Sequence, residues 1–176
     1  MAAGATYEPI ATNTLGSAAA SITFSSIPAT YTDLRLVFVG YSTFTSLNTG
    51  GIRLRFNADT ATNYSDTYLY ANGSSATSSS DASATYIYAG QIPDNVAATN
   101  IVGMMTADIF SYAGSTYKTV LTTSSSDLNT GSTLSTLTRS VGLWRSTAAI
   151  TSLTIIAGDP NFNIGTTATL YGIKNA

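Results

Sequence analysis

The sequence predicts a single all-β domain of the antiparallel β-sandwich class, and composition, alternation and turn signals all point to it. Only 9% of the 176 residues are charged, against about 25% in typical globular domains. Ser, Thr, Ala, Asn and Gly fill the deficit; Thr suits strands, while Ser, Asn and Gly suit turns. No segment has the Glu, Lys, Leu and Arg mixture of a surface helix. We therefore expect residues 1–176 to form one domain.

Alternating apolar residues predict about eight to ten short strands. Residues 33–39 carry apolar side chains on both faces, which predicts a strand covered on both sides. Residues 52–56 alternate Ile, Leu and Phe with two arginines, which predicts a half-buried strand. Further strands are expected at 21–25, 68–70, 86–88, 101–110, 116–123, 141–144, 150–156 and 166–173. Such a series favours a two-sheet jelly roll first and an immunoglobulin-like sandwich second.

Three turn-rich stretches separate the expected strands. Residues 42–51, 71–85 and 122–138 are read as loops, the last two nearly all Ser, Thr, Asn, Asp and Gly. Long loops in compact domains are usually functional or mobile, so these are expected either to contact other molecules or to be solvated. Residues 1–13 are expected to form an extended N-terminal arm.

The residue types that are missing exclude several kinds of chemistry. The chain has no Cys and no His, so disulfides, zinc, haem and iron–sulfur sites of the usual kinds are excluded, as are Ser–His and Cys–His nucleophiles. Glu8 is the sole glutamate, and no pair of the eight aspartates is marked by spacing. We expect a protein that is not an enzyme and has no metal or cofactor. Oxygens of Asn57, Asp59, Asn63 and Asp66 could hold calcium, but capping of a turn is the preferred interpretation.

Charge and hydropathy limit the partners. The seven basic residues are scattered along the sequence, so no basic patch that could bind nucleic acid is expected. The sequence contains no run of about 18 apolar residues, the length needed to span a membrane. Tyr7, Glu8 and Pro9 interrupt the first apolar stretch, so no signal peptide is expected. The formal net charge of −2 lets copies sit side by side with little repulsion. We expect a homo-oligomer that works at high local concentration.

Tyrosine, with eleven copies, is the aromatic residue in excess. A tyrosine offers apolar area and a hydrogen-bonding tip, which suits interfaces and sugar stacking as well as ordinary packing on a sheet. Trp144 lies in an apolar strand and is expected in the core or at a subunit seam, with Arg145 paired to a nearby aspartate. The candidate interface residues are Tyr68, Tyr70, Tyr86, Tyr88, Trp144 and Arg145.

Several stretches across nearly the whole chain resemble small structural proteins of tailed-phage virions, including phages of cyanobacteria and marine bacteria. They are YEPIAT (7–12), FSSIPATYTDL (24–34), LRFNAD (54–59) leading to NYS (63–65), VGLWRS (141–146) and LYGIK (170–174). These blocks mark kinship and are not catalytic motifs. Where the resemblance leads us to expect Gly in the middle of a turn, this chain has Ala58.

The resemblance implies a non-enzymatic β-sandwich of the virion, made in the bacterial host cytoplasm. The first expectation is a capsid decoration (cement) protein, a homotrimer on the outer shell that binds the major capsid protein and bridges capsomers. The second is a tail, baseplate or fibre domain whose tyrosines bind a host glycan. The third is a carbohydrate-binding or adhesive module of a secreted bacterial protein. No side-chain chemistry in the sequence separates the first two.

Overall fold

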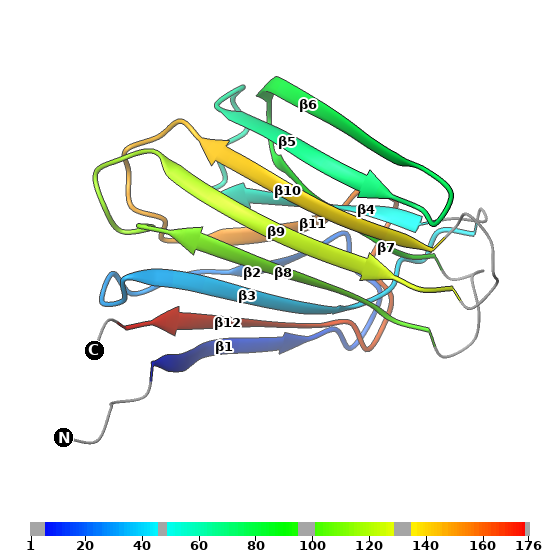
Figure 1. Ribbon diagram of the computed structural model, residues 1–176. Coiled ribbons are helices and arrows are strands. Elements are labelled where there is room, and N and C mark those ends of the chain that lie inside the picture. The colour runs from blue at the N-terminus through cyan, green and yellow to red at the C-terminus, as the bar shows by residue number, and fades with distance from the viewer. Residues whose placement is uncertain (1–5, 46–48, 95–100, 129–134, 175–176) are drawn as a thin grey trace.

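The computed structural model describes residues 6–45, 49–94, 101–128 and 135–174, and it is all-β (Figure 1). This confirms the predicted fold class. Two antiparallel sheets pack face to face as a sandwich. The strands are β1 (Tyr7–Thr14), β2 (Ser21–Phe24), β3 (Asp33–Gly40), β4 (Thr49–Phe56), β5 (Tyr64–Ala71), β6 (Ala76–Ala84), β7 (Ile87–Pro93), β8 (Gly103–Phe110), β9 (Lys118–Ser126), β10 (Thr136–Trp144), β11 (Leu153–Ala157) and β12 (Thr167–Ile173).

The pairing of the strands is nested. The eight-stranded sheet has the order β1-β12-β3-β8-β9-β10-β5-β6, and the four-stranded sheet has the order β2-β11-β4-β7. Thus β1 pairs with β12, β2 with β11, β3 with β8 and β4 with β7, as in one long hairpin rolled over a core. This order favours the jelly-roll arrangement over the immunoglobulin-like one. The hairpins β5–β6 and β9–β10 are additions that widen the large sheet.

The core lies between the two sheets, as the alternation of apolar residues requires. Leu34, Leu36 and Phe38 of β3 are fully buried, and so are the apolar residues of β4 that alternate with Arg53 and Arg55. The expectation that residues 33–39 are covered on both faces is wrong for the isolated chain. Their second face points away from the four-stranded sheet, and Val39 is 39% exposed there.

The structure also corrects the loops and the N-terminal arm. Residues 76–84, expected within a loop, form strand β6, and the expected loop 122–138 contains the end of β9 and the start of β10. Residues 7–13 of the expected arm belong to edge strand β1, which pairs with β12. Of the expected loop 42–51, residues 46–48 lie outside the described residues, and β4 begins at Thr49. Strand β6 was missed because it is exposed along almost its whole length and so lacks alternation.

The added hairpin β9–β10 turns hydroxyl groups toward the other sheet. Its inward-facing residues near β7 are mostly Ser and Thr, and Thr138 and Ser140 are essentially buried. Gly90 of β7, with a φ of 124°, lies against these strands, and a Cβ there would be 1.9 Å from the Ser124 Oγ. Glycine is required at this position because a side chain would collide with β9. The described residues contain no helix long and apolar enough to cross a membrane.

Candidate functional site

A small cavity lies where the large sheet extends past the small one. Strand β7 is the edge of the four-stranded sheet and packs mainly on β8, β9 and β10, whereas the β5–β6 hairpin continues beyond it. The cavity measures about 200 Å³. It is lined by residues from β5, β6, β7 and the turn before β7: Asp66, Tyr68, Ser79, Ser80, Asp81, Tyr86 and Tyr88. We call it the tyrosine cavity.

Three of the four tyrosines singled out from the sequence meet in this cavity. The rings of Tyr68 and Tyr88 are 4.6 Å apart between centroids, although the residues belong to different sheets. The guanidinium of Arg53 lies 4.5 Å from the centre of the Tyr86 ring, a distance at which cation–π attraction holds the ring in place. Burial raises the pKa of Tyr88, so its hydroxyl stays protonated. Tyr70 lies on the same face of β5 as Tyr68 but does not line the cavity.

Two carboxylates share the cavity with the tyrosines. Asp66 and Asp81 are directly opposite each other on β5 and β6, next to a β-bulge that shifts the register between Tyr64 and Asp66. Asp66 is 6% exposed, and its Oδ2 accepts the backbone N–H of Tyr88 at 2.9 Å. Burial, followed by the charge of Asp81, raises the pKa of the Asp66 carboxyl above its ordinary value.

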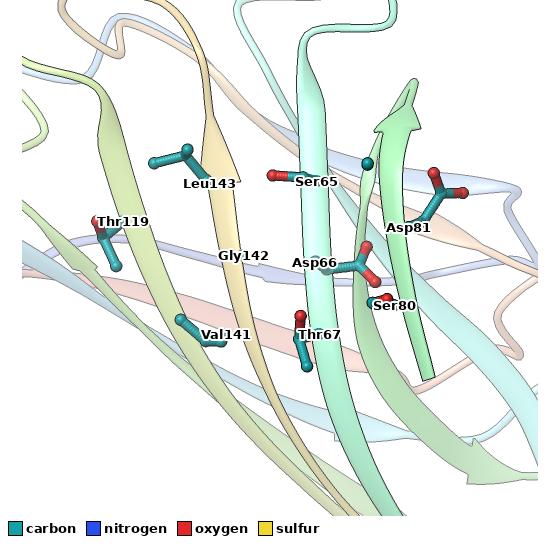
Figure 2. A pocket seen from close by; sticks show the side chains of 10 residues that line it. Ser65, Asp66, Thr67, Ser80, Asp81, Thr119, Val141, Gly142 and Leu143 are labelled. Atoms are coloured by element: carbon teal, nitrogen blue, oxygen red, sulfur yellow. The ribbon is translucent and has the colours of Figure 1, made fainter. Parts of the chain in front are cut away.

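The same pair of carboxylates borders a second cavity, of about 430 Å³, shown in Figure 2. This cavity is lined by β5, β6, β9 and β10 and includes Val141, Gly142 and Leu143. In Figure 2 the Asp66 carboxylate points from β5 toward β6, next to the register shift between these two strands. Asp66, Ser80 and Asp81 therefore face two openings.

Trp144 and Arg145 do not belong to either cavity. Trp144 is in the core, as one of the two sequence expectations had it: it is 2% exposed and packs on Phe56 and Tyr64. Its Nε1 donates to Asp59 Oδ2 at 2.8 Å. The expected pairing of Arg145 with an aspartate is wrong. Its guanidinium donates instead to the carbonyl oxygens of Thr62, in the turn before β5, and Ala82 of β6.

The turn that could hold calcium on sequence grounds is held by its own hydrogen bonds. Asp59 accepts the backbone N–H of Ala61 and the side-chain amide of Asn63, each at 2.9 Å. Asn57 Oδ1 accepts the backbone N–H groups of Thr151 and Ser152. These contacts are those of turn capping, the preferred interpretation of the sequence. Within the part of the chain that the structure describes, no three acidic side chains gather as metal ligands would.

A second candidate surface is the side of the eight-stranded sheet that faces away from the small sheet, which we call the outer face. None of the described residues covers this face, and the large apolar side chains on it are about half exposed: Val39, Leu69, Met104, Phe110, Leu137 and Val141. They belong to β3, β8, β10 and β5, four of the five neighbouring strands β3-β8-β9-β10-β5. Arg35 and Asp108 on the same face form an ion pair at 3.3 Å.

Sequence reasoning found the tyrosines but not their surroundings. Ser79 and Asp81 line the cavity, and Arg53 contacts its Tyr86, only because the fold brings β4, β6 and β7 together; no spacing along the chain marks them. The sequence groups Asp66 with the turn at 57–63, whereas its side chain lines the tyrosine cavity.

The chain matches no protein-family model, no curated protein and no solved structure.

Proposed function

We propose that this protein is a non-enzymatic structural component of a bacteriophage virion, a decoration protein that binds the outer capsid shell and stabilises contacts between capsomers. The observation that carries the proposal is the uncovered outer face of the large sheet. Val141 and Leu137 of β10 are 46% and 54% exposed, and Leu121 of β9 lies opposite Val141. The exposed side chains of Met104 and Val39 lie opposite each other on β8 and β3. Exposed apolar patches usually mark surfaces that bind another protein.

The size of this face suits a stable contact. Five strands about 4.8 Å apart, each about 27 Å long, give an area of roughly 650 Å² in plan. Standard protein–protein interfaces bury about 800 Å² on each partner, so the outer face with its rim is of the right order. A broad sheet face can lie against a shell made of repeated subunits, and we assign the major capsid protein as its partner.

The charges on the outer face are few. Arg35 and Asp108 neutralise each other within the chain, so neither needs a partner charge when the face is covered. Arg139, between Leu137 and Val141 on β10, forms no ion pair with a described residue and would need an acceptor on the partner. The chain as a whole carries a formal net charge of only −2, which allows many copies to sit close together on a shell. The resemblance to virion proteins noted in the sequence supports the same assignment.

The large sheet also supports the proposed homotrimer. Its two edge strands are β1 and β6, and eight of the nine residues of β6 are exposed. An exposed edge offers unpaired N–H and C=O groups that a neighbouring chain can pair with. A contact between the β6 edge of one copy and the β1 edge of the next is head-to-tail, and three such contacts close into a trimeric ring when each copy is rotated by about 120° from the last.

The test is the number of copies in purified virions, measured by quantitative mass spectrometry against the major capsid protein. Hundreds of copies in a fixed ratio to the shell protein are expected. A protein missing from purified virions would overturn the proposal.

A second candidate function is a tail, baseplate or fibre domain that attaches to the host surface. The tyrosine cavity favours it, because rings and carboxylates at one opening suit a glycan. Copies in threes, sixes or twelves would assign the protein to the tail and contradict decoration of the shell.

A further inference from the structure

We propose that the tyrosine cavity is a saccharide site whose ligand is one neutral or amine-bearing sugar ring of a larger glycan. This goes beyond a role in the virion shell and does not depend on it. The cavity holds three tyrosine rings, two carboxylates and two serines. Its volume of about 200 Å³ lies below the range of roughly 300–1,000 Å³ for drug-sized ligands, so it suits a single ring.

The aromatic part of the site can stack on a sugar. Sugar rings present faces of C–H groups, which pack on the flat faces of aromatic side chains as other apolar groups do. Tyr68 and Tyr88 are tilted by 48° to each other, so they form two walls rather than one closed stack. Arg53 fixes the Tyr86 ring from a neighbouring strand, which reduces the ordering cost of binding.

The polar part of the site can bind hydroxyl groups. Asp66 uses Oδ2 for the Tyr88 N–H and Asp81 uses Oδ1 for the Ser83 N–H, both at 2.9 Å. Each carboxylate therefore keeps an oxygen to which the described residues donate no hydrogen bond. Hydrogen bonds from sugar hydroxyls to a carboxylate are charge-assisted and stronger than neutral ones. Ser79 and Ser80 add hydroxyls that both donate and accept.

The charge of the site selects among sugars. Two of the lining residues, Asp66 and Asp81, carry carboxyl groups, and none of the described lining residues is basic. A sialic or uronic acid would bring a third carboxylate into this cavity, which is unfavourable at close range. A neutral hexose adds no charge, and the ammonium of an amino sugar is attracted. The Arg53 guanidinium is taken up by the Tyr86 ring, so we expect acidic saccharides to bind more weakly than neutral or amine-bearing ones.

The site is also held in a fixed shape. Most of its residues lie on paired strands, and the bulge beside Asp66 is fixed by the pairing of β5 with both β6 and β10. Sites on paired strands keep their side chains in place better than sites on loops.

The experiment uses the purified full chain. A glycan array identifies the best saccharide, and titration calorimetry with galactose, glucosamine and N-acetylneuraminic acid compares neutral, amine-bearing and acidic rings. We expect the first or second to bind more tightly than the third. Asp81→Ala and Tyr86→Ala, which alter less buried residues, should each weaken binding about tenfold or more, the equivalent of about 1.4 kcal/mol.

The matched control is Tyr117→Ala, since Tyr117 is 52% exposed and lies outside the cavity. Its affinity should equal that of the unaltered chain. Circular dichroism tests whether Tyr68→Ala folds. If it does not fold, Tyr68→Phe replaces it, because this variant keeps the ring and should retain stacking. The proposal is overturned if no saccharide binds at millimolar concentration, if acidic rings bind best, or if the cavity variants bind as well as Tyr117→Ala. The copy number in virions, which tests the proposed structural function, is measured separately and does not depend on any of these outcomes.

Discussion

The turn between β4 and β5 shows how one residue departs from the best local choice. Asp59 N–H donates to the carbonyl of Phe56 at 2.9 Å, and the two residues between them both have positive φ: 50° at Asn57 and 53° at Ala58. These are the features of a type I′ turn, in which Asn followed by Gly is preferred. Ala58 therefore occupies a left-handed conformation that costs roughly 1 kcal/mol relative to Gly.

Ala58→Gly should stabilise the protein by about 0.5–1 kcal/mol, because glycine removes the strain of a Cβ at positive φ. Thermal unfolding followed by circular dichroism measures the change. The control is Ala61→Gly two residues beyond the turn, where φ is not positive and the added chain entropy should lower stability instead. Equal effects of the two substitutions would contradict the strain at position 58.

At the scale of elements, one carboxylate ties the β4–β5 turn to β10. Asp59 accepts hydrogen bonds from Asn63 and from the Trp144 indole, and these hold the pKa of the Asp59 carboxyl below its usual range, the Asn63 bond having the larger effect. A lowered pKa in the folded state means that the ionised carboxylate stabilises the fold at pH values above the unfolded pKa of about 4. That stabilisation is lost as the pH falls through the lowered pKa.

Asp59→Asn should lower the free energy of unfolding at pH 7 by about 1–3 kcal/mol, because an Asn offers one acceptor oxygen in place of two and leaves a donor unpaired. The difference from the unaltered chain should shrink as the pH falls through the lowered pKa of Asp59, because the native carboxylate then becomes protonated and neutral like Asn. Urea unfolding in a series of buffers from pH 7 down to about pH 2 measures the change. Asp108→Asn serves as the control, since its surface ion pair with Arg35 is worth about 0–1 kcal/mol. A difference independent of pH would contradict the assigned role.

At the scale of the whole molecule, the large sheet is wider than the sheet that covers it. The four-stranded sheet (β2, β11, β4 and β7) packs on the inner face of the eight-stranded sheet. None of the described residues covers the outer face (Figure 1). The extra width has two consequences. It creates the tyrosine cavity beyond β7, and it presents the outer face for which we propose a capsid partner.

Val141→Asp should therefore weaken binding of the purified chain to shells assembled without it by at least tenfold, because the substitution places a charge in a contact that loses water. Co-sedimentation with such shells measures the loss. The control is Val102→Asp, because Val102 is 54% exposed but precedes β8 and lies outside the outer face. Full binding of the Val141 variant would mean that the shell contacts another surface.

Local sequence determined the class of fold and most of its strands. Alternation in residues such as Leu34, Leu36 and Phe38 depends only on the period of two along a strand, so it is visible without knowledge of any partner. The turn at Asn57 and Asp59 was equally visible, because capping involves residues close in the chain. The Ser-rich strand β6 was not, since its backbone is held by pairing with β5 rather than by an apolar face.

Tertiary structure alone decided which polar groups are buried and which residues meet. Lys118 is fully buried and donates to the carbonyls of Gly114 and Thr116, and nothing in its neighbours along the sequence indicates this. Tyr68 and Tyr88 could be named from composition, but their contact with each other and with Asp66 and Asp81 depends on how two sheets of unequal width are laid together. The sequence specifies short-range periodicity and turn chemistry, whereas sites assembled from strands distant along the chain exist only after the sheets have formed.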